Sequence, residues 1–303
     1  MYPLWKLQPI IIPPEVLFNI GPIPVTNTLI GTWIGIVALV IFFFAGTRRQ
    51  DMIPRGAQNF VEWAVESLLT LVESVSGKAK ARKFFPLVGT FFMFILFCNL
   101  LDVFPGVDTI GSINQTALQA AHLPPPSSIL LFGNYSIMLA PWVRPGTSDL
   151  NLTLAMALVS VIVTQVFGFM TLGAKVHLSK YFNFKALFTH GFQGPIEFFV
   201  GIIELITELS RILSFSFRLF GNIFAGSAVL AVFAYILPFF ANVLFIPLEL
   251  FVAFVQALIF ALLTLVFLEI ATSNPEHAEG ETVKEAEEQF ARSEREKEAA
   301  AAS

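Results

Sequence analysis

The sequence predicts an all-helical integral membrane protein with about five membrane helices. Of its 303 residues, 55% are hydrophobic and only 13% are charged, whereas soluble domains carry charge on about a quarter of their residues. Five charge-free runs are each long enough, at a rise of about 1.5 Å per residue, to cross a hydrocarbon core of roughly 30 Å. These runs cover residues 16–47, 84–101, 150–174, 219–248 and 250–268.

The basic residues orient these helices. Seven Lys and Arg residues lie between the first and second runs, one lies in the next connection, three lie in the stretch 174–194 after the third run, and four lie in the tail. Cytoplasmic loops of membrane proteins are the ones rich in Lys and Arg. The alternation therefore places the N-terminus and the 106–148 loop outside and the C-terminus in the cytoplasm. Termini on opposite sides require an odd number of spans, which agrees with five.

Three regions follow from this pattern. The extracytoplasmic N-terminal segment, 1–23, is proline-rich and extended. The membrane domain, 24–272, contains the extracytoplasmic loop insertion 106–148, which is rich in Gly, Pro, Ser and Asn and carries no recognisable chemistry. The charged cytoplasmic tail, 273–303, interleaves Glu with Lys and Arg, so we expect a solvated helix or a disordered segment there.

The first two spans are expected at about 25–45 and at 84–104. Between them, residues 54–76 place apolar side chains near helical spacing. These side chains are Phe60, Trp63, Ala64, Leu68, Leu71, Val72 and Val75. The pattern predicts an amphipathic helix on the cytoplasmic surface of the membrane or, with equal weight, an ordinary helix in a cytoplasmic loop.

The third span, 150–173, is unusually polar. Its polar side chains include Asn151, Thr153, Ser160, Thr164 and Gln165. Small polar residues in membrane helices serve helix packing as often as they line a water pathway, so both roles stay open.

The last two helices are predicted to be long and steeply tilted. Pro195 is typical of a helix start, and no further proline occurs before Pro238. A helix of about 42 residues would be about 60 Å long, twice the hydrocarbon thickness, so it must tilt, lie along the membrane or bend. Pro238, Asn242 and Pro247 then predict a turn, after which Pro247 opens a last helix that runs to about position 272.

The long helix carries a stripe of ionisable residues. Four of them recur at steps of seven: Glu197, Glu204, Arg211 and Arg218. Seven residues are nearly two helical turns, so the stripe drifts by only about 20° per step. An Arg at the centre of a membrane helix costs about 2.5–3.5 kcal/mol. Arg211 can pair with Glu204 or Glu208, but no acidic residue follows Arg218 before Glu249, so its partner could come from another protein.

An arginine has one chemical property that suits it to ion transfer, because it stays protonated at every accessible pH. At about 4 Å and an effective dielectric near 20 it attracts a carboxylate by on the order of 4 kcal/mol, which favours the ionised form by roughly three pKa units. A protonated carboxylic acid that reaches Arg218 would therefore release its proton. The same charge would separate a cytoplasmic route near Glu204 from an outer route near Glu249 and Gln256.

Four sequence motifs resemble one known family. Residues 216–226 read SFRLFGNIFAG and residues 254–264 read FVQALIFALLT, while 99–106 reads NLLDVFPG and 149–155 reads DLNLTLA. In this order they are similar to subunit a of F-type ATP synthases, and the resemblance covers most of residues 24–272.

The resemblance implies a role for individual residues. Arg218 would be the coupling arginine that faces the carboxylates of a ring of c subunits. Gln256 matches the polar partner of that arginine on the last helix, and Asn222 matches the asparagine that follows it. Glu204 matches the acidic position towards the cytoplasmic exit.

Two positions depart from the common pattern. Glu249 stands where some members have histidine, and Ser227 stands where those members have glutamate. The outer route here is therefore expected to depend on Glu249. Glu208 and Glu197 complete the expected ion pathway.

The resemblance also implies partners and location. The chain would be a non-catalytic, ion-translocating stator subunit, with H⁺ the expected ion, in the inner membrane of a bacterium. Its partners would be the c-subunit ring, the peripheral-stalk b subunits, the rest of the ATP synthase complex and membrane lipid. No cofactor or metal is expected, and the sequence has no GxxxxGK[ST] loop for a nucleotide. The net charge of −4 disfavours nucleic-acid binding.

The alternative function is a self-contained secondary transporter with a substrate site at the membrane midplane. Such proteins often have two related halves with matched broken helices. The sequence shows no internal repeat, which favours the stator subunit.

Overall fold

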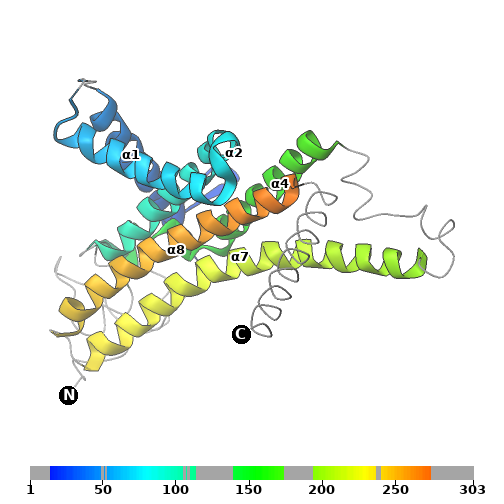
Figure 1. The fold of residues 1–303 in the computed structure, drawn as a ribbon. Helices are drawn as coiled ribbons and strands as arrows, with labels where there is room; N and C mark the ends of the chain where they lie inside the picture. Colours follow the sequence, from blue (N-terminus) through cyan, green and yellow to red (C-terminus); the bar gives the residue numbers. More distant parts are fainter. Residues whose placement is uncertain are drawn as a thin grey trace, which may run out of the picture. The chain divides into compact units, whose positions relative to one another are not determined.

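Five helices dominate the computed structural model, which describes residues 14–48, 51, 53–104, 107, 110–113, 139–173, 194–236 and 240–273. They are α1 (Asn27–Thr47), α2 (Ala57–Val103), α4 (Leu150–Leu172), α7 (Gly194–Ile236) and α8 (Phe240–Thr272) (Figure 1). Each contains a stretch long and apolar enough to cross a membrane. The predicted helical membrane fold with five spans is confirmed, while the steep tilt of α7 and α8 stays a prediction. The tail beyond residue 273 and most of the 106–148 loop lie outside the described residues.

The start of α8 differs from its prediction. The helix begins at Phe240, so Pro247 lies inside it and does not open it. A proline removes one backbone hydrogen bond from a helix. Membrane helices tolerate this loss because neighbouring groups and local adjustments satisfy the freed carbonyl. The expected turn at Pro247 is therefore wrong.

Two short strand pairs accompany the helices, and the sequence did not predict them. Strand β1 (Val16–Ile20) pairs antiparallel with β2 (Ile23–Thr26), and β3 (Gly111–Ile113) pairs antiparallel with β4 (Leu139–Pro141). The tight turn between β1 and β2 places Gly21 at a φ of +62°, which glycine adopts without steric cost.

Helix α2 consists of two helices joined at Gly77, whose φ of 70° and ψ of 158° are not helical. The part before Gly77 is the helix predicted over 54–76. Val61 and Leu68 are both 6% exposed, whereas Phe60 and Trp63 are 56% and 62% exposed. The predicted apolar face is thus divided, because part of it packs inside the protein and the two aromatic residues remain outside. Its position on a membrane surface stays a prediction.

The chain divides into two compact units, residues 1–161 with 207–265 and residues 162–206 with 266–303. In the first unit, the ring of Phe260 on α8 packs against Phe91 of α2 and Phe215 of α7, with centroid distances of 5.3 and 5.1 Å. Aromatic pairs of this kind contribute about 0.5–1.5 kcal/mol beyond the area they bury. Within this unit they hold α8 against α2 and α7 against α8 (Figure 1). The three-region division expected from the sequence stays a prediction.

The end of the 106–148 loop has a structural role that the sequence did not reveal. Its last residues form a short buried 3-10 helix, η3 (Gly146–Ser148). The Thr147 hydroxyl donates a hydrogen bond of 2.7 Å to Asn99 of α2, and the Thr28 hydroxyl of α1 donates one of 3.1 Å to Asp149. These bonds join the segment 141–149 to both helices.

The lack of a side chain at Gly31 of α1 lets the segment 141–149 lie close to this helix, because a Cβ built at Gly31 collides with the backbone carbonyl of Arg144. We expect Gly31→Ala to displace the segment 141–149 and to lower the free energy of unfolding by about 2 kcal/mol, as overpacking does in other cores. Unfolding of the detergent-solubilised protein would measure this loss. Gly89→Ala is the control, because a Cβ there meets its nearest atom, in Phe85, at 3.5 Å. An equal loss in both variants would contradict the packing described here.

Two polar residues of α4 pack against other helices. Thr153 and Ser216 of α7 have hydroxyl oxygens 3.1 Å apart, and Ser160 and Thr264 of α8 have theirs 2.9 Å apart. All four side chains are buried. Of the two roles that the sequence left open for Thr153 and Ser160, the structure supports helix packing.

Candidate functional site

Arg218 projects from the exposed side of α7. Phe215, Leu219 and Ile223 form the buried face of this helix and are 3%, 0% and 5% exposed, whereas Arg218 is exposed. The buried residues recur every four positions, as the helical period requires. Arg218 forms no ion pair with any residue that the structure describes.

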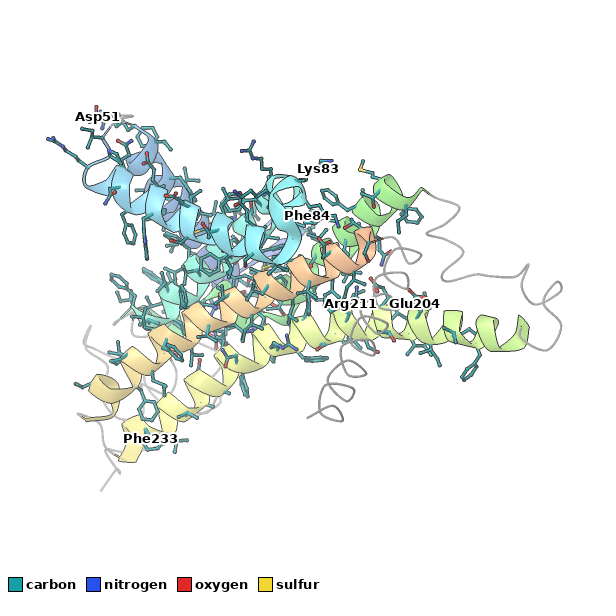
Figure 2. All side chains as sticks on the ribbon, in the orientation of Figure 1. Asp51, Lys83, Phe84, Glu204, Arg211 and Phe233 are labelled. Carbon is teal, nitrogen blue, oxygen red and sulfur yellow. The ribbon has the colours of Figure 1, made fainter. Side chains whose placement is uncertain are left out.

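Arg211, the second arginine of the stripe, is paired. Its Nη1 lies 3.0 Å from both carboxylate oxygens of Glu208, and the two side chains are 17% and 13% exposed. Glu208 is one of the two partners that the sequence allowed for Arg211. Glu204 is half-buried one turn before Glu208 on the same helix (Figure 2), while the side chain of Glu197 lies outside the described residues. Arg211 is therefore neutralised within the chain, which distinguishes it from Arg218.

Two contacts fix the register between α7 and α8. A Cβ built at Gly226 lies 3.4 Å from Glu249 Oε1, and Phe215 packs on Phe260. Eleven residues separate the two contacts on each helix, which makes the helices antiparallel and places position 218 opposite position 257. A third contact, between the rings of Phe233 and Phe245 at 4.6 Å, continues the pairing to the far end of α7 (Figure 2).

Gln256 consequently lies at the level of Arg218. It is 5% exposed, and its Nε2 has no hydrogen-bond partner among the described residues. A buried amide donor without a partner costs about 1–3 kcal/mol. Such a cost is typical of functional sites, where the missing partner is a water, an ion or another protein.

Glu249 lies about two helical turns beyond this level. It is half-buried, and its contact with Gly226 puts the carboxylate directly on the surface of α7. Any side chain longer than a methyl group at Gly226 would meet that carboxylate. The absence of a side chain at Gly226 therefore leaves room for Glu249 between the two helices.

The two remaining candidates on α7 differ in their environment. Asn222 is half-buried one turn after Arg218. Ser227 is also half-buried, but its hydroxyl donates a hydrogen bond of 3.0 Å to the carbonyl of Ile223 in the same helix. The single proton of Ser227 is thus used inside α7, whereas Asn222 keeps an amide group beside the arginine.

The surface of α7 beside Arg218 allows a close approach. Ser214 and Ala225 are exposed, and a Cβ built at Gly221 meets no atom within 4 Å. Phe217, 54% exposed, lies on the same side. Small residues on a membrane helix let another helix come close to its backbone. A helix that docked here would meet the guanidinium of Arg218.

The hydrogen bonds near this site have partners that sequence reasoning did not predict. Thr153 and Ser216 were not paired by any spacing rule, since 63 residues separate them. Asp149 accepts a hydrogen bond of 2.9 Å from the N–H of Asn151 and so caps the start of α4. Within the described ranges, no cluster of three or more His, Cys, Asp or Glu residues could hold a metal ion.

Comparison with known proteins points to one family. The family described as ATP synthase A chain matches residues 29–269. The chain is 30% identical over 255 residues to ATP synthase subunit a of Moorella thermoacetica, covering 84% of this chain and 94% of that protein. It is 32% identical over 262 residues to ATP synthase subunit a of Gloeobacter violaceus, with 85% and 90% covered. The protein of the same description from Campylobacter jejuni is 32% identical over 245 residues, with 79% and 88% covered.

Proposed function

Because the chain belongs to the ATP synthase A chain family, we propose that it is the ion-translocating stator subunit in the membrane sector of a rotary ATP synthase, with H⁺ as the ion. The observation that carries this proposal is Arg218, a permanent cation that is exposed on α7 and has no ion pair within the described part of the chain. An unpaired charge in a membrane is costly. A ring of c subunits that presents one carboxylate after another would supply the missing anion.

The chemistry follows from the fixed charge of Arg218. A ring carboxylate arrives protonated and neutral, since an ionised one would not cross lipid cheaply. Near the guanidinium its ionised form is favoured, so the proton leaves. The carboxylate then passes Arg218 and takes up a proton on the other side. Rotation of the ring and proton transfer are thereby coupled.

Two half-channels lead to this point in the proposed mechanism. Glu249, Gln256 and Asn222 form the outer one, because Glu249 contacts α7 at Gly226 and Gln256 shares the level of Arg218. Glu204, with Glu197 nearer the start of α7, forms the cytoplasmic half-channel. Glu208 is paired with Arg211, and the Ser227 hydroxyl is bonded to the carbonyl of Ile223. We therefore give both residues a smaller part in the ion route than Glu204 and Glu249.

The proposal also covers assembly and location. The chain is a multi-pass membrane protein of the ATP synthase A chain family. We place it in the inner membrane of a bacterium, with the N-terminus outside and the C-terminus in the cytoplasm. It would contact the c-subunit ring and the peripheral-stalk b subunits, and the catalytic chemistry on nucleotides would belong to other subunits.

Cross-linking tests the predicted contact with the ring. In a background with Cys98→Ala, we expect Ala225→Cys to form a disulfide with a cysteine placed beside the ring carboxylate, because Ala225 is on the exposed side of α7 with Arg218. Ile223→Cys is the matched control, since Ile223 is 5% exposed. Electrophoresis of the oxidised membranes would detect the product. Equal yields at both positions, or none at either, would contradict the proposed ring-facing side.

Purification separates this function from the secondary transporter. A stator subunit carrying an affinity tag should copurify with the ring, the peripheral stalk and the catalytic subunits after mild solubilisation. A chain that purifies alone, or as a homo-oligomer, under conditions that keep a control ATP synthase intact would favour the transporter.

A further inference from the structure

A buried hydrogen bond joins α4 to α7 two residues before Arg218. The hydroxyl oxygens of Thr153 and Ser216 are 3.1 Å apart, and these residues are 0% and 1% exposed. The Thr153 hydroxyl donates its proton to the carbonyl of Leu150 at 3.1 Å. A hydroxyl has one proton to donate, so Thr153 accepts the bond between the helices and Ser216 donates it.

The position of this bond relates it to Arg218. Two residues turn a helix by about 200°, so Ser216 and Arg218 project from nearly opposite sides of α7. The other buried side chains of this region, Phe215, Leu219 and Ile223, are apolar. Apolar burial is non-directional, whereas a hydrogen bond weakens steeply when its geometry is lost. A rotation of α7 about its axis would keep much of the apolar contact but would break the bond to Thr153.

We propose that Thr153 and Ser216 are positioning residues, whose hydrogen bond sets the rotation of α7 about its own axis and thereby the direction in which Arg218 meets the ring. This inference rests on the proposed function of Arg218. Neither residue touches the ion or the ring carboxylate in this role. Both act through the arginine.

The fold contains a matched control for this pair. Ser160 and Thr264 form a second buried hydrogen bond, 2.9 Å long, which joins α4 to α8. It resembles the first in its residue types, burial and length, and it starts from the same helix. Because it does not involve α7, removing it should leave the direction of Arg218 unchanged.

Ser216→Ala is the most direct test, because it removes the donor and leaves the Thr153 hydroxyl bonded to Leu150. The loss of stability should therefore be small. We expect the rate of ATP synthesis per assembled complex, measured in vesicles under an imposed proton gradient, to fall about fivefold, the factor by which one hydrogen bond shifts an equilibrium between two orientations. Ser160→Ala should keep the parent rate.

A second variant removes the same hydrogen bond by changing Thr153, its acceptor. Thr153→Val should lower the rate as Ser216→Ala does, and the double variant should be no worse than either single one, because both changes break one interaction. Thr153→Ser retains a hydroxyl and should restore the parent rate. A contribution to stability alone would change the amount of assembled complex without this pattern in the rate.

The orientation of α7 can also be measured without activity. Phe217 and Ala225 are both exposed and lie about 80° apart around the helix axis. Two proteins with Cys98→Ala would carry a cysteine at position 217 or at position 225. The quantity measured is the ratio of their cross-linking yields to the same ring cysteine. We expect Ser216→Ala to change this ratio and Ser160→Ala to leave it as in the parent.

The outcomes separate this inference from the proposed function. An unchanged rate and an unchanged ratio in both Ser216→Ala and Thr153→Val would overturn the positioning role. If Arg218→Ala in the same vesicles abolishes synthesis while those variants keep the parent rate and the parent ratio, only the positioning role fails. If Arg218→Ala retains coupled synthesis, the proposed function itself fails.

Discussion

Vesicles that carry Arg218→Ala in an otherwise intact complex should make no measurable ATP under an imposed proton gradient, and they should not pump protons when supplied with ATP. We expect a loss of at least about a hundredfold in both directions, the size of effect seen when one preorganised charge is removed from a reaction site. Without the cation, no group in the described chain forces an arriving carboxylate to ionise. Passive proton leakage through the membrane sector should rise, because the same charge separates the two routes.

The ion pair of Arg211 supplies the control for this experiment. Glu208→Gln together with Arg211→Gln removes both charges of this pair at once, so neither is left behind without the other. This double variant should keep most of the coupled rate, since the pair is neutral as a whole. The stator mechanism is wrong if Arg218→Ala assembles and still makes ATP near the parent rate.

Glu249→Gln is expected to have the next largest effect, a loss of about a hundredfold in proton-driven ATP synthesis, because an amide cannot accept and release a proton as a carboxylate does. The substitution keeps the shape of the side chain and its contact with Gly226. Glu249→Asp should retain part of the rate, since it keeps a carboxylate that is displaced by one methylene. Synthesis and ATP-driven pumping in the same vesicles would measure all three proteins.

Glu66→Gln is the matched control for Glu249. Glu66 is an exposed carboxylate on the part of α2 before Gly77, a helix that carries none of the proposed route residues. Its loss should leave synthesis at the parent rate. Equal rates in Glu249→Gln and the parent would show that the outer route does not pass through Glu249.

The membrane spans could be predicted because their signals are local. A charge-free run of 18 or more residues has few alternatives to a membrane helix, and α1 and α4 begin and end within about two residues of the expected positions. The bounds of α7 agree equally well, but they were predicted from Pro195 and Pro238, because the charge-free run 219–248 covers the end of α7 and the start of α8. The start of α8 could not be predicted in this way. Pro247 is a helix-breaking signal in water, but within a membrane bundle the helix continues through it.

Side-chain packing was less predictable than the helices. The sequence grouped Phe60 and Trp63 with Leu68 and Val72 as one apolar face, but the structure buries only the second pair. Spacing specifies which residues share a helix face, and it does not specify what covers that face. The strand pairing of β3 with β4 depends on contacts between distant parts of the chain and has no local signal.

The sequence by itself determined that the chain is a five-span membrane protein of this family, and it singled out Arg218 as a cation within a membrane helix. It could do so because hydropathy and sequence motifs are properties of neighbouring residues. Only the tertiary structure decided which arginine is neutralised, which level of α8 lies opposite Arg218 and which hydroxyls join α4 to α7. Those answers depend on the pairing of residues far apart in the chain, such as Thr153 with Ser216 and Gly226 with Glu249. Such pairs form when helices pack, so no spacing along the chain reveals them.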